Sequence, residues 1–431
     1  MSSSVFPLPE GTHTVVLGVG DVNGAMRGKR IPASNWAATC EEGNAICAAI
    51  FAMDMTSDIW DTPYCSLANG YVDMHLFPLA APAATPWEPG VAIVLGRAEA
   101  LDHGPVPIDP RGALLTQIER AAALGITVEV GTELEFYLLD PETKRPRGNG
   151  ISLYGIDRAA ELEPVIGPIR NHLEAIGIPI EQSNPEYAPG QVEVNIRHAD
   201  ALTSADRVVL FRSAIKQIAA RHGSLATFMA KPFIDQSGSG FHTHYSLWKN
   251  GQNLFADSGR LSKTGRHFLA GLEKRIAEAS LAASTTPNAF RRRRPSTFCP
   301  TNVSWGVDNR TAALRVIEGK SHQVRIEKRD GAADANPYYL LATEIAAGLD
   351  GIEQRLEPTP PVEGNAYERP DLPALPRDLS HAVALAKGSE FLKRVIGEDR
   401  LTILVRQAER EIDFVEAQVT PVETERYLVN F

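Results

Sequence analysis

Residues 126–139 read ITVEVGTELEFYLL, and this stretch shows what the fold has to accommodate. Its apolar and β-branched residues predict a strand, but two glutamates, Glu133 and Glu135, interrupt it. Residues two apart share one face of a strand and lie about 7 Å apart. Carboxylates buried between apolar neighbours need a cation or a metal ion to compensate them. Other charged groups are therefore expected on the same face of the sheet.

Two more segments repeat this spacing. His242 and His244 lie two apart in GSGFHTHYSLW, and Arg325, Glu327 and Arg329 alternate in VRIEKRD. Any one of these pairs could be the polar side of a half-solvated strand. The recurrence in strands that are otherwise apolar favours a shared site.

A further pair of carboxylates, Glu186 and Glu193, brackets the turn in NPEYAPGQVEV. Four or five glutamates with one imidazole match the ligands that Mg²⁺ or Mn²⁺ prefers. The absence of cysteine from this set argues against structural zinc. The glycines of SGSG beside His242 allow a close backbone approach to a ligand, but the phosphate-loop pattern GxxxxGK[ST] is missing.

Four consecutive arginines, Arg291 to Arg294, occur in the stretch FRRRRPSTFCP (290–300) of a chain whose formal net charge is −10. An acidic protein is poorly suited to wrapping nucleic acid, so no nucleic-acid partner is expected. Acidic metal ligands facing several arginines suit phosphoryl transfer, because guanidinium groups neutralise the moving phosphoryl group. The residues alone therefore indicate a metal-dependent, ATP-using enzyme acting on an acidic small molecule.

The length of 431 residues favours two domains, with a boundary in the proline-rich DHGPVPIDPR. We expect a small α+β module over 1–107 and a larger α/β or α+β domain, built around a substantial sheet, over 108–431. In the first, TVVLGVGDVNG predicts a strand and a turn at Asn23-Gly24, and residues 35–55 predict a helix broken near Gly43. YVDMHLFPLA and GVAIVLGRAEAL predict further strands.

Helices and strands alternate in the second domain. RGALLTQIERAAALG predicts a helix that ends at Gly125, and further helices with strands after them are expected over 166–186 and 205–233. NPYYLLATEIAAGLDGI (336–352) predicts a long amphipathic helix. A proline-rich connection over 358–376 precedes the final helices.

The cysteines and the first residues of the sequence indicate the cellular location of the protein. Cys40, Cys47, Cys65 and Cys299 form no CxxC pair, which is typical of reduced thiols in a cytosolic protein. The start MSSSVFPLPE lacks the basic and apolar regions of a signal peptide, and no apolar stretch approaches about 18 residues. The expected location is cytoplasmic, without a membrane partner.

Taken together, these motifs resemble the type I glutamine synthetase superfamily, over nearly the whole chain. The matching stretches, in family order, are DVNGAMRGKRIP, DPRGALL, GTELEFYLL, PEYAPGQVEVNI, GSGFHTHYSLW, NRTAALRV and RIEKRDGAADANPYYLLATEIAAGLDGI. The resemblance implies an N-terminal β-grasp domain and a catalytic domain whose curved antiparallel sheet, flanked by helices, forms a funnel. It also implies hexameric rings, expected to stack into a dodecamer, in which a neighbour's N-terminal domain completes each active site.

The resemblance also assigns roles, position by position. It implies two or three Mg²⁺ or Mn²⁺ ions per site, one on Glu135, Glu186 and Glu193, and a second on Glu133, His242 and Glu327. Positions near the nucleotide, ATP, are Glu181, His244, Ser246, Arg315 and Arg325. Positions that act on the phosphate oxygens and in catalysis are Arg310, Arg315 and Arg329. Positions expected around the substrate glutamate are Arg292, Gly238, Arg329 and Glu135.

One departure from the family pattern concerns the third substrate. Glutamine synthetases proper read roughly PGYEAP after the arginine clamp, with a glutamate that helps to bind and deprotonate ammonium. This chain reads PSTFCP and places Phe298 there. An aromatic ring cannot attract ammonium as a carboxylate does, but it can pack on a larger amine or make a cation–π contact. No DGSS-type ammonium motif is present, although Asp54, Asp58 or Asp61 could supply an acid.

The chain is thus most similar to the γ-glutamyl amine and polyamine ligases of the superfamily. The implied reaction is phosphorylation of the γ-carboxylate of glutamate by ATP, followed by attack of an organic amine and release of phosphate. Phe298, Phe290 and Trp305 favour an alkyl or aryl amine. The alternatives are an ordinary glutamine synthetase with a variant flap and a non-catalytic structural or regulatory member. Tyr367 is expected to be an exposed loop residue.

Overall fold

The fold is that of a computed structural model, which describes residues 5–148 and 150–431. A six-stranded sheet comes first, in the order β2-β1-β6-β4-β3, with β5 paired to β6. β1 and β6 are parallel, and the other pairs are antiparallel. The strands are β1 (Thr14–Gly20), β2 (Met26–Pro32), β3 (Asn44–Cys47), β4 (Asp73–Pro78), β5 (Ala83–Ala84) and β6 (Val91–Glu99).

The second sheet has nine strands in the order β15-β16-β17-β11-β7-β9-β8, with β10 on β7 and β12 on β11. Its pairs are antiparallel except for β15 and β16. The strands are β7 (Thr127–Leu139), β8 (Ile180–Pro185), β9 (Gln191–Asp200), β10 (Leu225–Thr227), β11 (Phe241–Lys249), β12 (Gln252–Asn253), β15 (Trp305–Val307), β16 (Leu314–Ile317) and β17 (Arg325–Lys328). A separate hairpin joins β13 (Ala256–Asp257) and β14 (Arg260–Leu261). The fold class is α+β, as expected.

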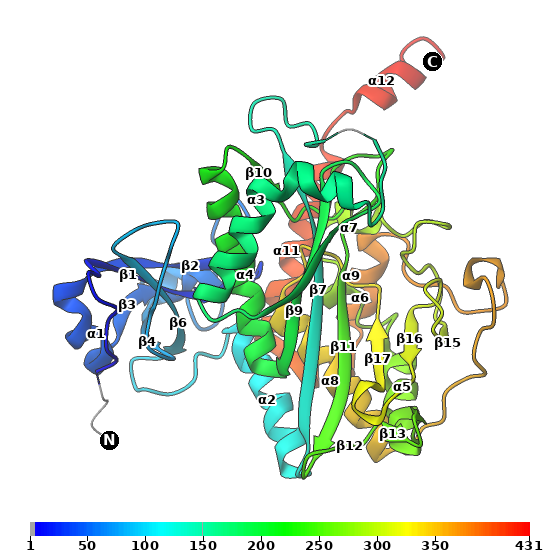
Figure 1. The fold of residues 1–431 in the computed structure, drawn as a ribbon, viewed down its shortest axis with the longest axis horizontal. Helices are drawn as coiled ribbons and strands as arrows, with labels where there is room; N and C mark the ends of the chain where they lie inside the picture. Colours follow the sequence, from blue (N-terminus) through cyan, green and yellow to red (C-terminus); the bar gives the residue numbers. More distant parts are fainter. Residues whose placement is uncertain (1–4, 149) are drawn as a thin grey trace.

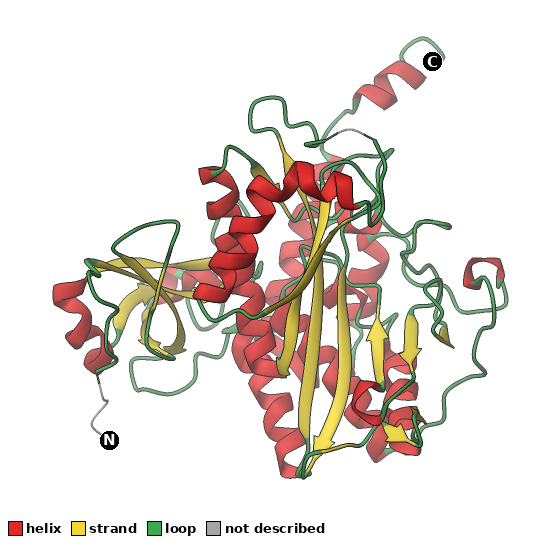
Figure 2. Ribbon diagram, viewed as in Figure 1, coloured by secondary structure: helices red, strands yellow, loops and turns green. Residues whose placement is uncertain are grey.

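Alternation along the central strands gives this sheet two different faces. In β7 the even-numbered residues, such as Leu134 and Phe136, are fully buried against the helices, whereas Glu133 and Glu135 face the other way. β11 and β17 repeat this arrangement, with Tyr245 and Ile326 in the core. Figure 2 shows the long central strands with helices packed around them. The open face is left for polar groups.

The helices cover the apolar face and the periphery. α3 and α4 share one apolar cluster with β7, and α2, α5 and α8 share the other. α12 projects away from the rest of the chain (Figure 1). The α-helices are α1 (Trp36–Glu42), α2 (Pro110–Ala123), α3 (Ile156–Ala175), α4 (Ala201–Arg221), α5 (Lys263–Arg275), α6 (Ser280–Ala283), α7 (Pro287–Phe290), α8 (Pro337–Glu353), α9 (Leu379–Lys387), α10 (Glu390–Ile396), α11 (Glu398–Glu416) and α12 (Pro421–Tyr427).

Most predicted elements are present, but three differ. The segment 35–55 breaks at Gly43, as predicted, where φ is +76°, but only its first part is helical, and β3 and a 3-10 turn follow. The strand expected over 225–233 shortens to β10, because the chain then leaves the sheet. α8 is not amphipathic but buried on nearly all sides, since α2, α4 and α5 surround it. Among the described residues, no helix has the length and apolar character needed to span a membrane.

Candidate active site

A cavity of about 480 Å³ opens on the polar face of the nine-stranded sheet. The strand register gathers its charged residues, because His242 pairs with Glu133, Glu193 with Glu135, and Glu327 with His244 as direct cross-strand neighbours. Side chains opposite one another in an antiparallel pair have Cβ atoms about 5 Å apart. Residues two apart along a strand therefore form one compact cluster across four neighbouring strands, β9, β7, β11 and β17.

The first group of carboxylates is Glu135, Glu186 and Glu193. One oxygen from each lies within 4.8 Å of the others. Burial, reinforced by the other carboxylates, raises the pKa of Glu186 to about 8 and that of Glu193 to about 9. Such crowding is costly without a cation. The donors are all hard oxygens, so the group fits Mg²⁺ or Mn²⁺.

The second group surrounds Glu133. His242 Nδ1 lies 3.6 Å from both Glu133 Oε2 and Glu327 Oε1, between the two carboxylates. His244 Nε2 lies 3.0 Å from Glu133 Oε1, so His244, which was expected near the nucleotide, also belongs to this cluster. Burial raises the pKa of Glu133, but the two imidazoles outweigh it and hold that pKa below its usual value. This mixed oxygen and nitrogen set also fits a divalent cation.

Several arginines line the cavity next to these acids. Arg315 Nη1 donates to Glu327 Oε2 at 3.0 Å, and Arg329 Nη1 donates to Glu327 Oε1. Burial raises the pKa of Glu327, but Arg329 and the histidines outweigh it and lower that pKa to about 2. Arg325 and Arg310 line the same cavity. The carboxylate of Glu327 thus stays ionised between metal-ligand candidates and guanidinium groups.

Arg292 and Gly238 lie together at another side of the cavity. Arg292 Nη1 donates to the carbonyl of Gly331 at 2.8 Å, which orients a guanidinium that is almost wholly buried. A Cβ on Gly238 would lie 2.5 Å from Arg292 Cγ, so only glycine fits here. Gln191 Nε2 donates both to the Gly238 carbonyl and to Glu135 Oε2, which links this corner to the first carboxylate group.

The four consecutive arginines separate into different environments. Arg292 lines the cavity, whereas Arg293 is buried over the ring of Phe290 and lies 3.6 Å from Asp330. Arg291 and Arg294 are exposed and line a different hollow, of about 350 Å³. One member of the run therefore reaches the site, and a second acts in the core.

Four large, exposed side chains line the cavity. Phe298 is 56% exposed with φ +56°, and Leu153, Tyr154 and Tyr187 are also exposed. A left-handed backbone is uncommon for an aromatic residue and often marks a functional position. The three residues other than Phe298 were missed from the sequence, because they lie in loops without periodicity.

Two aromatic residues expected near the amine do not line this cavity. Phe290 lies under Arg293, and the Trp305 indole donates to the carbonyl of Thr359 at 2.6 Å. Tyr367 is half-buried rather than exposed, and its hydroxyl donates to the carbonyl of Cys299, next to Phe298. Tyr367 therefore anchors the segment that carries Phe298.

The acids that could have replaced the missing ammonium motif already have partners in the N-terminal sheet region and on α11. Asp54 accepts from Thr56 and Asp58, and Arg410 pairs with Asp54 and Asp58. Asp61 accepts from the Tyr71 hydroxyl at 3.0 Å. None of the three lines the cavity described above.

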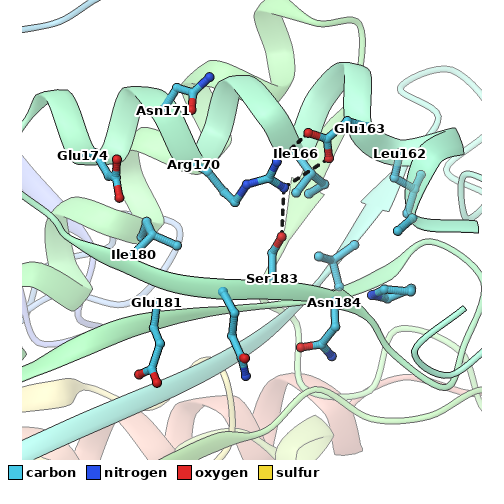
Figure 3. A pocket seen from close by; sticks show the side chains of 14 residues that line it. Leu162, Glu163, Ile166, Arg170, Asn171, Glu174, Ile180, Glu181, Ser183 and Asn184 are labelled. Atoms are coloured by element: carbon cyan, nitrogen blue, oxygen red, sulfur yellow. Dashed lines mark hydrogen bonds and ion pairs between the residues drawn. The ribbon is translucent and has the colours of Figure 1, made fainter. Parts of the chain in front are cut away.

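Two residues expected near the nucleotide lie outside the cavity lining. Ser246 accepts a hydrogen bond from the Trp248 indole at 2.9 Å. Glu181 borders a groove of about 580 Å³ between α3 and β8, in which Arg170 pairs with Glu163 and donates to Ser183. In Figure 3 Ser183 points toward α3, whereas Glu181 points away from it. Gln182 borders both the groove and the cavity.

Comparison with known families decides the assignment. Residues 107–427 match the glutamine synthetase catalytic domain. The chain belongs to the glutamine synthetase family. Members of this family are ATP-dependent ligases that use divalent metal ions, so the chain is an ATP-dependent carbon–nitrogen ligase, and the expected resemblance is confirmed.

Two relatives and one solved structure of this glutamine synthetase family align with nearly the full length of this protein. It is 36% identical to the γ-glutamylethanolamide synthetase GlnA4 of Streptomyces coelicolor, over 96% of this chain and 92% of that protein. It is 33% identical to a glutamate–isopropylamine ligase of Pseudomonas sp, over 96% and 95%. Its structure matches that of GmaS bound to ADP with a TM-score of 0.86 at 29% identity, covering 97% of each chain.

Metal binding by this family member should depend on pH. Glu186 and Glu193 bind protons more tightly in the folded protein than in the unfolded chain, where their pKa is near 4.5. The free energy of unfolding of the metal-free protein should therefore fall as the pH rises from 4.5 toward 8 and 9. We expect Mg²⁺ to raise the midpoint of thermal unfolding more at about pH 9 than at about pH 6, because protons compete with the ion.

The Glu186→Gln variant is the control, because it removes one of the two titrating carboxylates. Its metal-dependent stabilisation should be smaller and should vary less with pH. An equal shift of the midpoint at both pH values in the unchanged protein would contradict proton competition at these carboxylates.

Proposed function

We propose that the protein joins the γ-carboxylate of glutamate to an organic amine, with ATP activating the carboxylate as γ-glutamyl phosphate. The observation that carries this proposal is the position of Phe298. Its exposed ring lines the same cavity as Arg292 and both carboxylate groups, where glutamine synthetases proper carry a glutamate. A neutral ring removes the charge that would hold ammonium and supplies a surface for an amine's carbon atoms.

Each wall of the cavity has a proposed task. Arg292 holds the α-carboxylate of glutamate, and the carbonyl of Gly238 accepts from its ammonium group. Arg310 and Arg315 contact phosphate oxygens, while Arg329 lies near the γ-carboxylate. Divalent ions on the two carboxylate groups would neutralise the charge of the phosphate oxygens. The nitrogen of the amine then bonds to the γ-carbonyl carbon, and phosphate leaves.

The lip of the cavity favours an amine with an alkyl or aryl body. Leu153, Tyr154, Tyr187 and Phe298 are between 45% and 57% exposed there. The names of two relatives, an ethanolamide synthetase and an isopropylamine ligase, agree with a small organic amine. A polyamine would need more carboxylate groups at this lip than the described residues supply.

We also propose that the protein forms an oligomer. This proposal rests on the family resemblance and on exposed apolar residues in the C-terminal segment. Val419, Val422, Leu428 and Phe431 are all more than two-thirds exposed on and around the projecting α12. Exposed apolar side chains in such a group mark an interaction surface. We propose hexameric rings stacked into a dodecamer, with the N-terminal region 1–107 of one subunit beside the cavity of its neighbour.

The test is phosphate release from ATP with glutamate and Mg²⁺, comparing alkyl and aryl amines with ammonium. Loss of a charged partner costs a cation about 1.5–3 kcal/mol, so we expect organic amines to exceed ammonium by roughly 10- to 100-fold in kcat/KM. Mass spectrometry should identify the γ-glutamyl amide. Efficient turnover of ammonium alone would instead assign the protein as a glutamine synthetase with a variant flap.

The Phe298→Glu variant provides the matched comparison, because it restores a carboxylate at the exposed position. Its preference should move toward ammonium, while its KM for ATP stays near that of the unchanged protein. An unchanged preference would show that Phe298 does not contact the amine.

A further inference from the structure

A second cavity, of about 630 Å³, lies between the N-terminal sheet region and the helices. Its walls come from the β1–β2 turn with Met26, from α4, from Phe228 and Met229, and from the α11 residues Phe414 and Val415. Its lining shares no residue with the candidate active site. Its volume falls in the range of about 300–1,000 Å³ that is typical of small-molecule sites.

Three buried polar atoms without a partner among the described residues belong to the side chains that line this cavity. They are Arg212 Nε, Gln407 Oε1 and Asp334 Oδ1. The Arg212 and Gln407 side chains are only 6% and 2% exposed. Buried polar groups in native proteins are nearly always hydrogen-bonded. Three such side chains around one space give its wall a polar character that suits a polar ligand.

The charges around the cavity have both signs. Arg212 and Lys216 come from α4, whereas Asp334 and Glu411 lie on other segments. No pair of them forms a salt bridge within the described part of the chain. Burial lowers the pKa of both cations and raises the pKa of both acids. Arg212 and Asp334 attract each other, but none of the four groups makes a close ion pair with another, so burial outweighs the attraction and a ligand charge could still stabilise each of them.

We propose that this cavity binds a free α-amino acid with an apolar side chain. The ligand's carboxylate meets Arg212 and Lys216, its ammonium group meets Asp334 and Glu411, and its side chain packs on the methionines and phenylalanines. A molecule with one charge would be attracted by only two of these four side chains, and an uncharged molecule would be attracted by none of them. This site goes beyond the ligase reaction and does not depend on which amine the enzyme uses.

Isothermal titration calorimetry with three matched probes tests the proposal. L-phenylalanine carries both charges, 2-phenylethylamine lacks the carboxylate, and 3-phenylpropionate lacks the ammonium group. We expect phenylalanine to bind with a Kd of about 1 mM or lower and the other two to bind at least tenfold more weakly. Comparable binding of all three, or no binding of phenylalanine, would overturn the proposal.

Variants separate this cavity from the active site. Lys216→Gln and Glu411→Gln should each weaken phenylalanine binding about tenfold, while ligase activity without phenylalanine is unchanged. Arg292→Leu, which removes the proposed glutamate clamp, should leave the binding of phenylalanine intact. Loss of binding in Arg292→Leu together with full binding in the other two variants would place the amino acid at the glutamate position and overturn the assignment.

Discussion

The Glu327→Ala variant is expected to lose phosphate release almost completely while the proposed oligomer stays assembled. Glu327 is 1% exposed, accepts from Arg315 and Arg329, and lies 3.6 Å from His242. Its removal deletes one candidate metal ligand and frees two guanidinium groups that it holds in place. A metal ion contributes several kcal/mol to stabilising charge in the transition state, so kcat should fall by roughly 10³-fold. Coupled phosphate detection and size-exclusion chromatography measure the two expectations.

Glu327→Gln and Glu363→Gln complete this experiment. Glu327→Gln keeps the volume of the side chain but not its charge, so it should be nearly as inactive as Glu327→Ala. Glu363 is an exposed carboxylate on the proline-rich connection, and its amide variant should keep full activity. Activity of Glu327→Ala within about tenfold of the unchanged protein would refute the assignment of Glu327 to the metal site.

The part of the site that follows from the sequence is the part built on strands. Residues two apart on β7, β11 and β17 must share a face, so Glu133, His242 and Glu327 could be predicted to face one site. Spacing does not say which strands are neighbours. The register that sets Glu193 beside Glu135 therefore became visible only in the fold.

The errors have a common physical origin in tertiary contacts. Polar and apolar residues are mixed along α8, which suggested that one side of this helix faces water. Its polar residues are instead buried with partners; Glu344, for example, accepts a hydrogen bond from Thr243 and pairs with Lys328. Leu153 and Tyr154 reach the cavity from a loop whose path no periodicity describes. Trp305 is an aromatic residue of the kind expected in a pocket for an amine, but its indole points toward Thr359 and donates to the carbonyl of that residue.

Neighbouring residues of β17 face opposite sides of the sheet, so one of them can serve the active site while the next stabilises the core. Lys328 is an example. It follows Glu327 in β17 but points into the core, where its ammonium group contacts Asp330 and lies 2.8 Å from Glu344 Oε1. Burial lowers the pKa of Lys328, but the two acids outweigh it and raise that pKa. Beneath the site, therefore, lies a buried ionic cluster that the two-residue spacing did not reveal.

The Lys328→Met variant is expected to be destabilised by about 3–5 kcal/mol, because it takes the nearest cation away from two buried carboxylates and leaves only Arg293, 3.6 Å from Asp330, nearby. The unfolding midpoint in urea measures the change, and Lys263→Met, at the exposed start of α5, should be nearly neutral. Adding Glu344→Gln to Lys328→Met should recover part of the loss, since it removes one of the uncompensated charges.

The pH dependence of this loss distinguishes electrostatics from packing. Burial, opposed by Lys328, already raises the pKa of Glu344, and removal of the lysine should raise it further. The folded variant would then bind protons more tightly than its unfolded chain, so its deficit relative to the unchanged protein should be small near the unfolded pKa of 4.5 and grow as the pH rises. A deficit of the same size at about pH 5 and about pH 8 would mean that lost packing, and not the uncompensated charge, destabilises the variant.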